Sequence, residues 1–160
     1  AHMMQPRAKS MREHRRLVTH REEDLTERLV AGLRAIDGVE TFSIFGEDHD
    51  RAPVVSFVID GLEPGLVSAA LSAEHAIAVR DGKFCAHLLV DALLEDAGVE
   101  ARSAVRVSAG LANTDEHIER LLTAVESLAT RGPRAAYHVV EGEGWVPVED
   151  PRDLSVTLPW

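Results

Sequence analysis

The sequence predicts a two-layer α/β (α+β) domain, in which a mixed sheet of about four short strands is covered by helices. Two observations lead to this class. Stretches with apolar residues at helical spacing alternate with short β-branched runs along the chain. The 160 residues are 45% hydrophobic and 28% charged, which supplies a core for one domain and excludes a disordered chain. We also expect a long first helix and an extra C-terminal hairpin or tail.

A long helix opens the predicted domain, from about residue 10 to residue 36. Its apolar residues recur at helical spacing. They are Leu25, Leu29, Val30, Leu33 and Ile36. Gly38 ends the helix, since glycine readily takes the conformation that closes a helix. Alternating residues then predict a half-buried strand at 41–44.

The next strand, residues 54–59 (VVSFVI), is rich in β-branched residues and is expected to be buried on both faces. A polar loop at 46–52 precedes it. In this loop His49 lies between two aspartates, which we interpret as a solvated loop and not as a metal site. Pro64 suits the first turn of the following helix, because its missing N–H is not needed there.

In the middle of the chain, residues 77–80 predict a short strand and residues 81–84 a turn. Cys85 is then expected to open a helix that ends near Gly98. The inward side of this helix is predicted to carry Leu88, Leu89, Ala92 and Leu93.

The last predicted strand of the sheet covers residues 105–108. Asn113 and Thr114 then cap a helix that has acidic residues in its first turn, and Gly132 breaks it. From Arg134 onward we expect a small hairpin or an extended tail. We divide the chain into residues 1–9, a tag remnant and disordered N-terminus, residues 10–131, the domain proper, and residues 132–160, an extension.

Charge and cysteine content exclude several classes of function. The chain has 27 acidic residues against 17 lysines and arginines, for a net charge of −10, so we expect no nucleic-acid partner. No apolar run is long enough to span a membrane and no signal peptide is evident, so we expect a cytoplasmic protein. One cysteine excludes an internal disulfide framework, and we predict no metal site.

Cys85 is the candidate nucleophile. It follows a strand and a glycine turn, and a helix N-terminus together with nearby Arg80 and Lys83 would favour its thiolate. A small apolar core cysteine is an equally good interpretation of the spacing. Arg106 lies inside an apolar strand, where it either faces solvent, as spacing alone favours, or contacts a carboxylate.

Short motifs along residues 10–128 occur in an order and spacing that resemble a known family. They are His20-Arg-Glu22, Arg51-x-Pro53, Gly61-x-x-Pro64, Val79-Arg80-x-Gly82-x-x-Cys85-Ala86, Val105-Arg106-x-Ser108 and Asn113-Thr114-x-Glu116. Together they resemble the C-terminal region of cysteine desulfurases and related class V aminotransferases. Two departures are Phe84, which stands where many desulfurases carry histidine, and His87, which follows Ala86 where desulfurases vary. They leave desulfurase, selenocysteine-lyase-like and other class V chemistry open.

The resemblance implies the small domain of a fold-type-I enzyme that uses pyridoxal phosphate in its parent form. It implies that Cys85 is the catalytic cysteine that becomes a persulfide, that Arg106 grips the carboxylate of an amino-acid substrate, and that Arg80 lies near substrate and cofactor. It also implies a homodimer or a separate large domain as partner. We therefore expect an exposed apolar patch near Cys85 and Arg106.

The two lysines of the chain, Lys9 and Lys83, do not stand in the family's Schiff-base context. We therefore expect no cofactor in this chain alone and no turnover by it. The alternative interpretation is a stand-alone module that uses Cys85 to accept a persulfide or to bind a protein. A third is a structural or regulatory domain in which Cys85 is inert.

Overall fold

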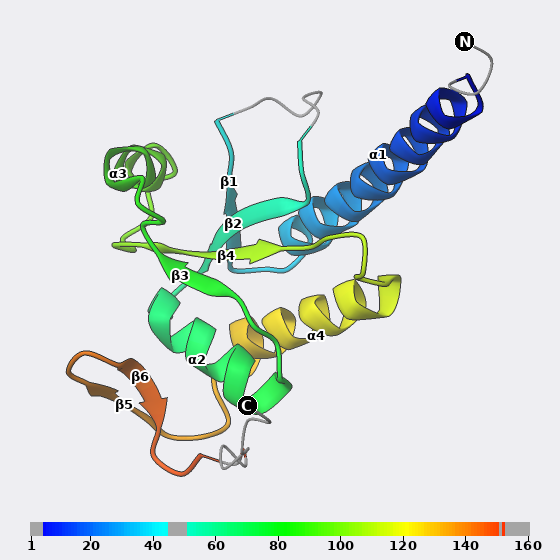
Figure 1. The fold of residues 1–160 in the computed structure, drawn as a ribbon. Helices are drawn as coiled ribbons and strands as arrows, with labels where there is room; N and C mark the ends of the chain where they lie inside the picture. Colours follow the sequence, from blue (N-terminus) through cyan, green and yellow to red (C-terminus); the bar gives the residue numbers. More distant parts are fainter. Residues whose placement is uncertain (1–4, 45–50, 151, 153–160) are drawn as a thin grey trace.

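A computed structural model describes the backbone of residues 5–44, 51–150 and 152, and their side chains from Ser10 onward. The predicted remnant before residue 5, the polar loop around His49 and the end of the C-terminal extension lie outside these ranges. Within them the chain is a mixed α/β fold, as predicted, with a four-stranded sheet and a separate two-stranded sheet. Figure 1 shows this arrangement, with the long first helix extending past the body of the domain.

The main sheet has the order β1-β2-β4-β3, with β1 at Val39–Phe42, β2 at Val54–Ile59, β3 at Arg80–Gly82 and β4 at Ala104–Ser108. All three pairings are antiparallel, whereas a mixed sheet was predicted. The reason lies in the topology. A helical connection returns β3 in the same direction as β2, but β4 inserts between these two strands and runs opposite to both.

Three helices cover one face of this sheet: α1 at Gln5–Arg34, α2 at Pro64–His75 and α4 at Asp115–Arg131. The main core lies between them and the sheet. Its fully buried residues include Leu25, Leu29, Leu33, Phe57, Val67, Leu71, Val105 and Val125. The apolar stripe predicted for the first helix is thus largely confirmed, although α1 also extends over residues 5–9, which were expected to be disordered.

The opposite face of the sheet is only partly covered. Helix α3, His87–Asp96, packs Val90 and Leu94 against Val58 of β2 and Ala104 of β4. Strand β2 is therefore buried on both faces toward its end, as its sequence predicted. The predicted inward side of α3 is wrong, because Leu88 is 88% exposed and Leu89 is 43% exposed.

Local signals set most element boundaries. Pro64 is at the first turn of α2, and Thr114 is the N-cap of α4, both as predicted. Strand β3 begins at Arg80 and not at Ile77, because the N–H of Ile77 donates to the carbonyl of Leu71 and closes the end of α2.

The predicted C-terminal hairpin is also present. Its strands are β5 at Tyr137–Val140 and β6 at Gly144–Pro147, which pair antiparallel and pack against α2. The contact is close at Gly65 of α2, where a Cβ atom would lie 2.9 Å from the Trp145 ring. Glycine at this position therefore allows the hairpin to approach the helix.

Candidate functional site

The two arginines singled out in the sequence are neighbours in the sheet. Arg80 of β3 is the direct cross-strand partner of Arg106 of β4, and on its other side Arg106 is opposite Ser56 of β2. Residues directly opposite in an antiparallel pair project from the same face. Because Ala104 and Val58 lie on this face too, both arginines belong to the side of the sheet that α3 only partly covers.

Arg106 is half-buried, and its guanidinium lies over the ring of Phe84, 5.0 Å from the ring centroid. Its Nε atom is buried and has no hydrogen-bond partner among the residues that the structure describes. A buried N–H without an acceptor is costly, so this position favours an incoming anion. A carboxylate matches the planar fork of a guanidinium with two parallel hydrogen bonds.

Cys85 lies in a tight turn between β3 and α3. Phe84 and Cys85 have φ angles of 53° and 61°, a left-handed conformation that is uncommon for residues with a side chain. The N–H of Ala86 donates to the carbonyl of Lys83 across the turn, at 2.8 Å. The helix begins only at His87, so the prediction that Cys85 opens it is wrong. The physical reason is the turn itself, since left-handed residues cannot form the first turn of a helix.

The Cys85 thiol is exposed, which excludes the core-cysteine interpretation for this structure. In the chain it follows Phe84, whose ring contacts Arg106, and it comes soon after Arg80. The structure thus joins Arg80 and Arg106 through the sheet and links Cys85 to Arg106 through Phe84.

Sequence reasoning noted Phe84 only as a departure from the family pattern and assigned it no contact. The signal that could have identified its role is an aromatic residue next to the candidate nucleophile, in a chain with only 4% aromatic residues. A ring face attracts a guanidinium cation.

Lys83 does not fit the role of a cofactor lysine. Its ammonium group is ion-paired with Asp91 of α3, at 2.5 Å, and this pair ties the Cys85 turn to the helix. A lysine that forms a Schiff base needs a free amine, whereas this one is ion-paired with a carboxylate. The side chain of Lys9 lies outside the described residues.

The motif Asn113-Thr114-x-Glu116 has a structural role here. The Thr114 hydroxyl accepts a hydrogen bond from the N–H of His117, and the His117 ring accepts one from the N–H of Thr114. This reciprocal cap fixes the start of α4, which follows the loop after β4, the strand that carries Arg106.

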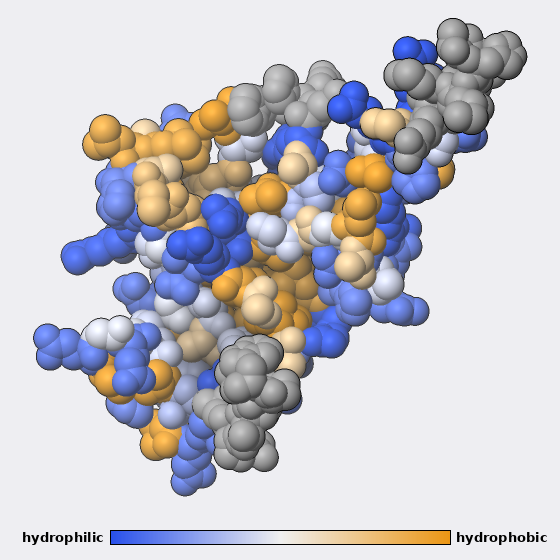
Figure 2. All heavy atoms as spheres, viewed as in Figure 1, coloured by the Kyte–Doolittle hydropathy of each residue, from blue (hydrophilic) through white to orange (hydrophobic). Residues whose placement is uncertain are grey.

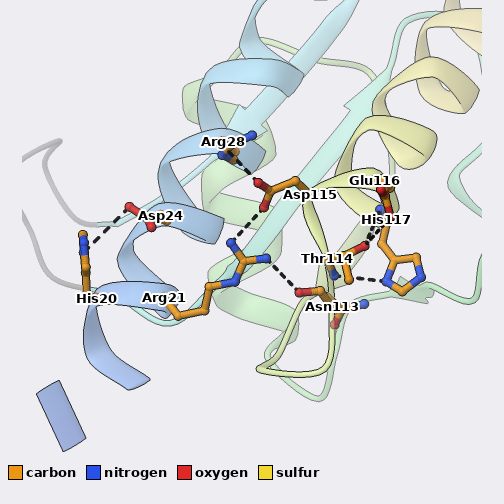
Figure 3. A network of polar contacts seen from close by, with 9 residues as sticks. All are labelled: His20, Arg21, Asp24, Arg28, Asn113, Thr114, Asp115, Glu116 and His117. Atoms are coloured by element: carbon orange, nitrogen blue, oxygen red, sulfur yellow. Dashed lines mark hydrogen bonds and ion pairs between the residues drawn. The ribbon is translucent and has the colours of Figure 1, made fainter. Parts of the chain in front are cut away.

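A second set of contacts holds the same corner against α1, as Figure 3 shows. The Arg21 guanidinium donates to the Asp115 carboxylate at 2.8 Å and to the Asn113 carbonyl at 3.0 Å, and Arg28 is 3.4 Å from Asp115. The hydrogen bond from Arg21 lowers the pKa of Asp115, and the charge of Arg28 acts in the same direction. These contacts tie the long helix to the end of β4 that leads into α4, the opposite end from the Cys85 turn.

An apolar surface flanks the site on α3. Figure 2 shows hydrophobic residues gathered over this helix, and Leu88 and Leu89 are its most exposed large members. Leu88 follows Cys85 by less than one helical turn. The sequence predicted such a patch near the candidate nucleophile.

Metal-binding clusters and membrane-spanning helices are both absent from the described part of the chain. In residues 5–44, 51–150 and 152, no group of three or more histidine, cysteine or acidic side chains is arranged to hold a metal ion. None of the helices in these ranges has the length and apolar composition required to cross a bilayer.

Comparison with known proteins gives a consistent result. The sequence model of the aminotransferase class-V family matches residues 11–121. A probable cysteine desulfurase of Xylella fastidiosa is 39% identical over 105 residues, which are 66% of this chain and 23% of that protein. A probable cysteine desulfurase of Pseudomonas aeruginosa is 39% identical over 109 residues, which are 68% of this chain and 24% of that protein.

Among solved structures, the apo structure of a cysteine desulfurase from Thermococcus onnurineus NA1 matches with a TM-score of 0.56 and 31% identity. The match covers 70% of this chain and 26% of that one. The chain therefore spans about a quarter of the length of these relatives.

Proposed function

The chain belongs to the aminotransferase class-V family, and from this membership we propose that it is the substrate-side domain of a cysteine desulfurase. The observation that carries the proposal is the pair formed by Arg80 and Arg106. The two residues are direct cross-strand partners on a half-open sheet face, and neither side chain has a hydrogen bond or ion pair to another described residue. Two neighbouring cations without anions favour a ligand that brings a carboxylate.

In this proposal Arg106 binds the α-carboxylate of an amino-acid substrate. Its buried Nε and its stacked guanidinium limit how the fork can turn, so the carboxylate is held in one orientation. Arg80, which is exposed, adds positive charge beside it and attracts the substrate.

Cys85 accepts the sulfur atom of the substrate as a persulfide in this proposal. Its exposure in the turn leaves the thiol open to a sulfur donor. When the donor is a low-molecular-mass persulfide, the Cys85 thiolate attacks the outer sulfur. A new S–S bond then forms on Cys85, the donor's S–S bond breaks, and the donor leaves as a thiolate.

Pyridoxal phosphate supplies the electron sink in enzymes of this class. Lys83 is paired with Asp91. We therefore propose that the cofactor is held by residues in the part of these enzymes that residues 11–121 do not represent. The chain alone is then expected to bind no pyridoxal phosphate and to show no turnover.

Two measurements on the chain test the proposal. Incubation with glutathione persulfide should add one sulfur atom to the intact mass, reversed by a thiol reductant, and C85S should add none. L-alanine should shift the side-chain NMR signal of Arg106 in the wild type. In R106Q the shifts of neighbouring residues on L-alanine addition should be lost. A chain that takes up no sulfur and binds no L-alanine would contradict the proposal. A stoichiometric lysine-aldimine absorbance band on addition of pyridoxal phosphate would contradict the expectation that the chain alone binds no cofactor.

The exposed thiol of Cys85 also favours a second candidate, a stand-alone module that accepts a persulfide from a partner protein. The two candidates differ in the use of Arg106. A carrier module would take up sulfur at Cys85 with no binding of L-alanine, whereas a substrate-side domain shows both.

We propose that the apolar surface of α3 is buried in the working enzyme, against the larger part of a desulfurase or in a homodimer. Leu88 and Leu89 support this, since a neighbouring pair of large apolar side chains is costly to leave exposed to water.

A further inference from the structure

Phe84 stands between the two parts of the proposed site. Its ring faces the guanidinium of Arg106, with 5.0 Å between Cζ and the ring centroid, and its backbone leads directly into Cys85. The same ring packs on the apolar cluster under α3, which contains Val58 and Val90. The ring therefore packs on the apolar cluster under α3 on one side and contacts Arg106 on the other.

We propose that Phe84 is a positioning residue that couples carboxylate binding at Arg106 to the reactivity of the Cys85 thiol. This inference rests on the proposed function, in which Arg106 binds the substrate carboxylate. It goes beyond that function because it assigns a task to a residue that touches neither the carboxylate nor the sulfur.

The first step of the coupling is electrostatic. The ring face attracts the guanidinium because the face of an aromatic ring carries partial negative charge. The buried Nε of Arg106 has no acceptor among the described residues, and the guanidinium contacts this ring. A bound carboxylate offers a stronger partner, so the guanidinium turns toward the carboxylate and its contact with the ring weakens.

The second step is mechanical. Phe84 and Cys85 are both left-handed, and such residues persist only where their surroundings hold them. The contacts that hold this turn include the ring on Arg106, the packing of the ring on the Val58 and Val90 cluster, the Lys83–Asp91 ion pair and the hydrogen bond from Ala86 to Lys83. When one of them weakens, the turn relaxes, and the thiol that it carries changes its exposure.

The experiment measures both ends of this coupling in the chain itself. Binding of L-alanine is followed by the NMR signals of the Arg106 Nε–H group and of the Phe84 ring. The reactivity of Cys85 is followed by its rate of alkylation with iodoacetamide, with and without L-alanine at constant ionic strength. In the wild type we expect both signals to move and the alkylation rate to change about fivefold, the lower range of typical couplings between sites.

Three variants separate positioning from a structural role. F84L keeps an apolar side chain and removes the ring, so L-alanine should still move the Arg106 signal while the alkylation rate stays constant. F84Y keeps the ring and should preserve the coupling. F42L truncates another phenylalanine that packs on the same cluster, and it should preserve the coupling as well.

The outcomes are distinguishable. No shift at Arg106 in the wild type overturns the carboxylate assignment, and the coupling with it. A shift at Arg106 with a constant alkylation rate overturns the coupling alone, as does an F84L chain that responds like the wild type. If F84L fails to fold, the NMR signals of the Phe84 ring in the wild type still test the coupling. Phe84 resonances that do not shift when L-alanine binds would contradict the proposal.

Discussion

A single carboxylate, Glu74, attaches the C-terminal hairpin to α2. Its side chain is 5% exposed and accepts hydrogen bonds from the N–H groups of Arg134 and Ala135, the Arg134 guanidinium and the Tyr137 hydroxyl. Burial raises the pKa of Glu74, but these hydrogen bonds outweigh it and the pKa is lowered. The ionised form is thus the one that the fold holds, and its contribution to stability is lost as the pH falls below about 4.5, the ordinary value.

Tyr137 reports on this carboxylate. Burial and the hydrogen bond to Glu74 raise the pKa of Tyr137 to about 12, from an ordinary value of 10.0. Because Tyr137 is the one tyrosine in the sequence, tyrosinate absorbance follows it directly. In E74Q the charge is removed, and the pKa should fall toward 10.0. E143Q, in the hairpin turn, is the control that should leave it unchanged, and an E74Q titration identical to the wild type would contradict the assignment.

His75 gives the fold a second pH dependence. Its Nε2 atom is buried with no partner among the described residues, and it lies near Arg120 of α4, Arg134 and Glu74. Burial lowers the pKa of His75, and the arginines add to this. The unfolded chain therefore takes up the proton more readily, so the free energy of unfolding should decrease as the pH falls below about 6.5. The free energy of unfolding of H75L, measured by urea denaturation, should decrease less than that of the wild type between neutral pH and the pH at which Glu74 is protonated. An equal decrease in both chains would contradict this.

At the scale of single elements, the N-terminal cap of α4 shows most clearly how a local sequence signal sets the boundary of a helix. The Thr114 hydroxyl satisfies one of the free N–H groups at the helix start. T114A should lower the free energy of unfolding by about 1 kcal/mol, measured by urea denaturation. T130A is the matched control, because the Thr130 hydroxyl bonds to Glu126 within the same helix and caps nothing. An equal loss in both variants would show that the cap adds nothing.

Elements with local signals were predictable, and those without were not. Pro64 and Thr114 placed the starts of α2 and α4, since proline and a capping hydroxyl act on the backbone next to them. Helix α3 has apolar residues on nearly all sides, so periodicity could not show that Val90 and Leu94 face the sheet. Which side of α3 packs against the sheet depends on how the helix lies across the sheet. That placement is a property of the whole fold.

Parts of the candidate site could likewise be predicted from the sequence, and other parts could not. The composition of β4 made Arg106 conspicuous, and the family pattern drew attention to Arg80 and Cys85. The pairing of Arg80 with Arg106 joins strands that are distant in sequence, and Phe84 in the left-handed turn packs on residues of β2, α3 and β4. Neither can be found in a short stretch of sequence.

At the scale of the whole molecule, the apolar surface of α3 should control self-association. The change L88E places a charge at the most exposed large apolar side chain. We expect the wild type to form dimers or larger species with increasing concentration, and L88E to shift this equilibrium toward monomers. Light scattering after gel filtration measures the species, and circular dichroism checks the fold.

The control for this change is L111E, which alters an exposed leucine in the loop between β4 and α4. It should associate like the wild type. A wild-type chain that stays monomeric at all concentrations, or an L88E chain that associates equally, would contradict a role of α3 in assembly.

The strand order has a consequence for how the chain acquires its site. Strand β4 is the last of the four in sequence, yet it occupies the interior of the sheet between β2 and β3. Pairings between segments distant in sequence close slowly during folding. Until β4 inserts, Arg80 and Arg106 are not neighbours, so the pair that we propose to bind a carboxylate is created in the step that completes the sheet. During refolding, affinity for a carboxylate should thus appear together with the final burial of Val105 and Val107, and not with the earlier formation of helices.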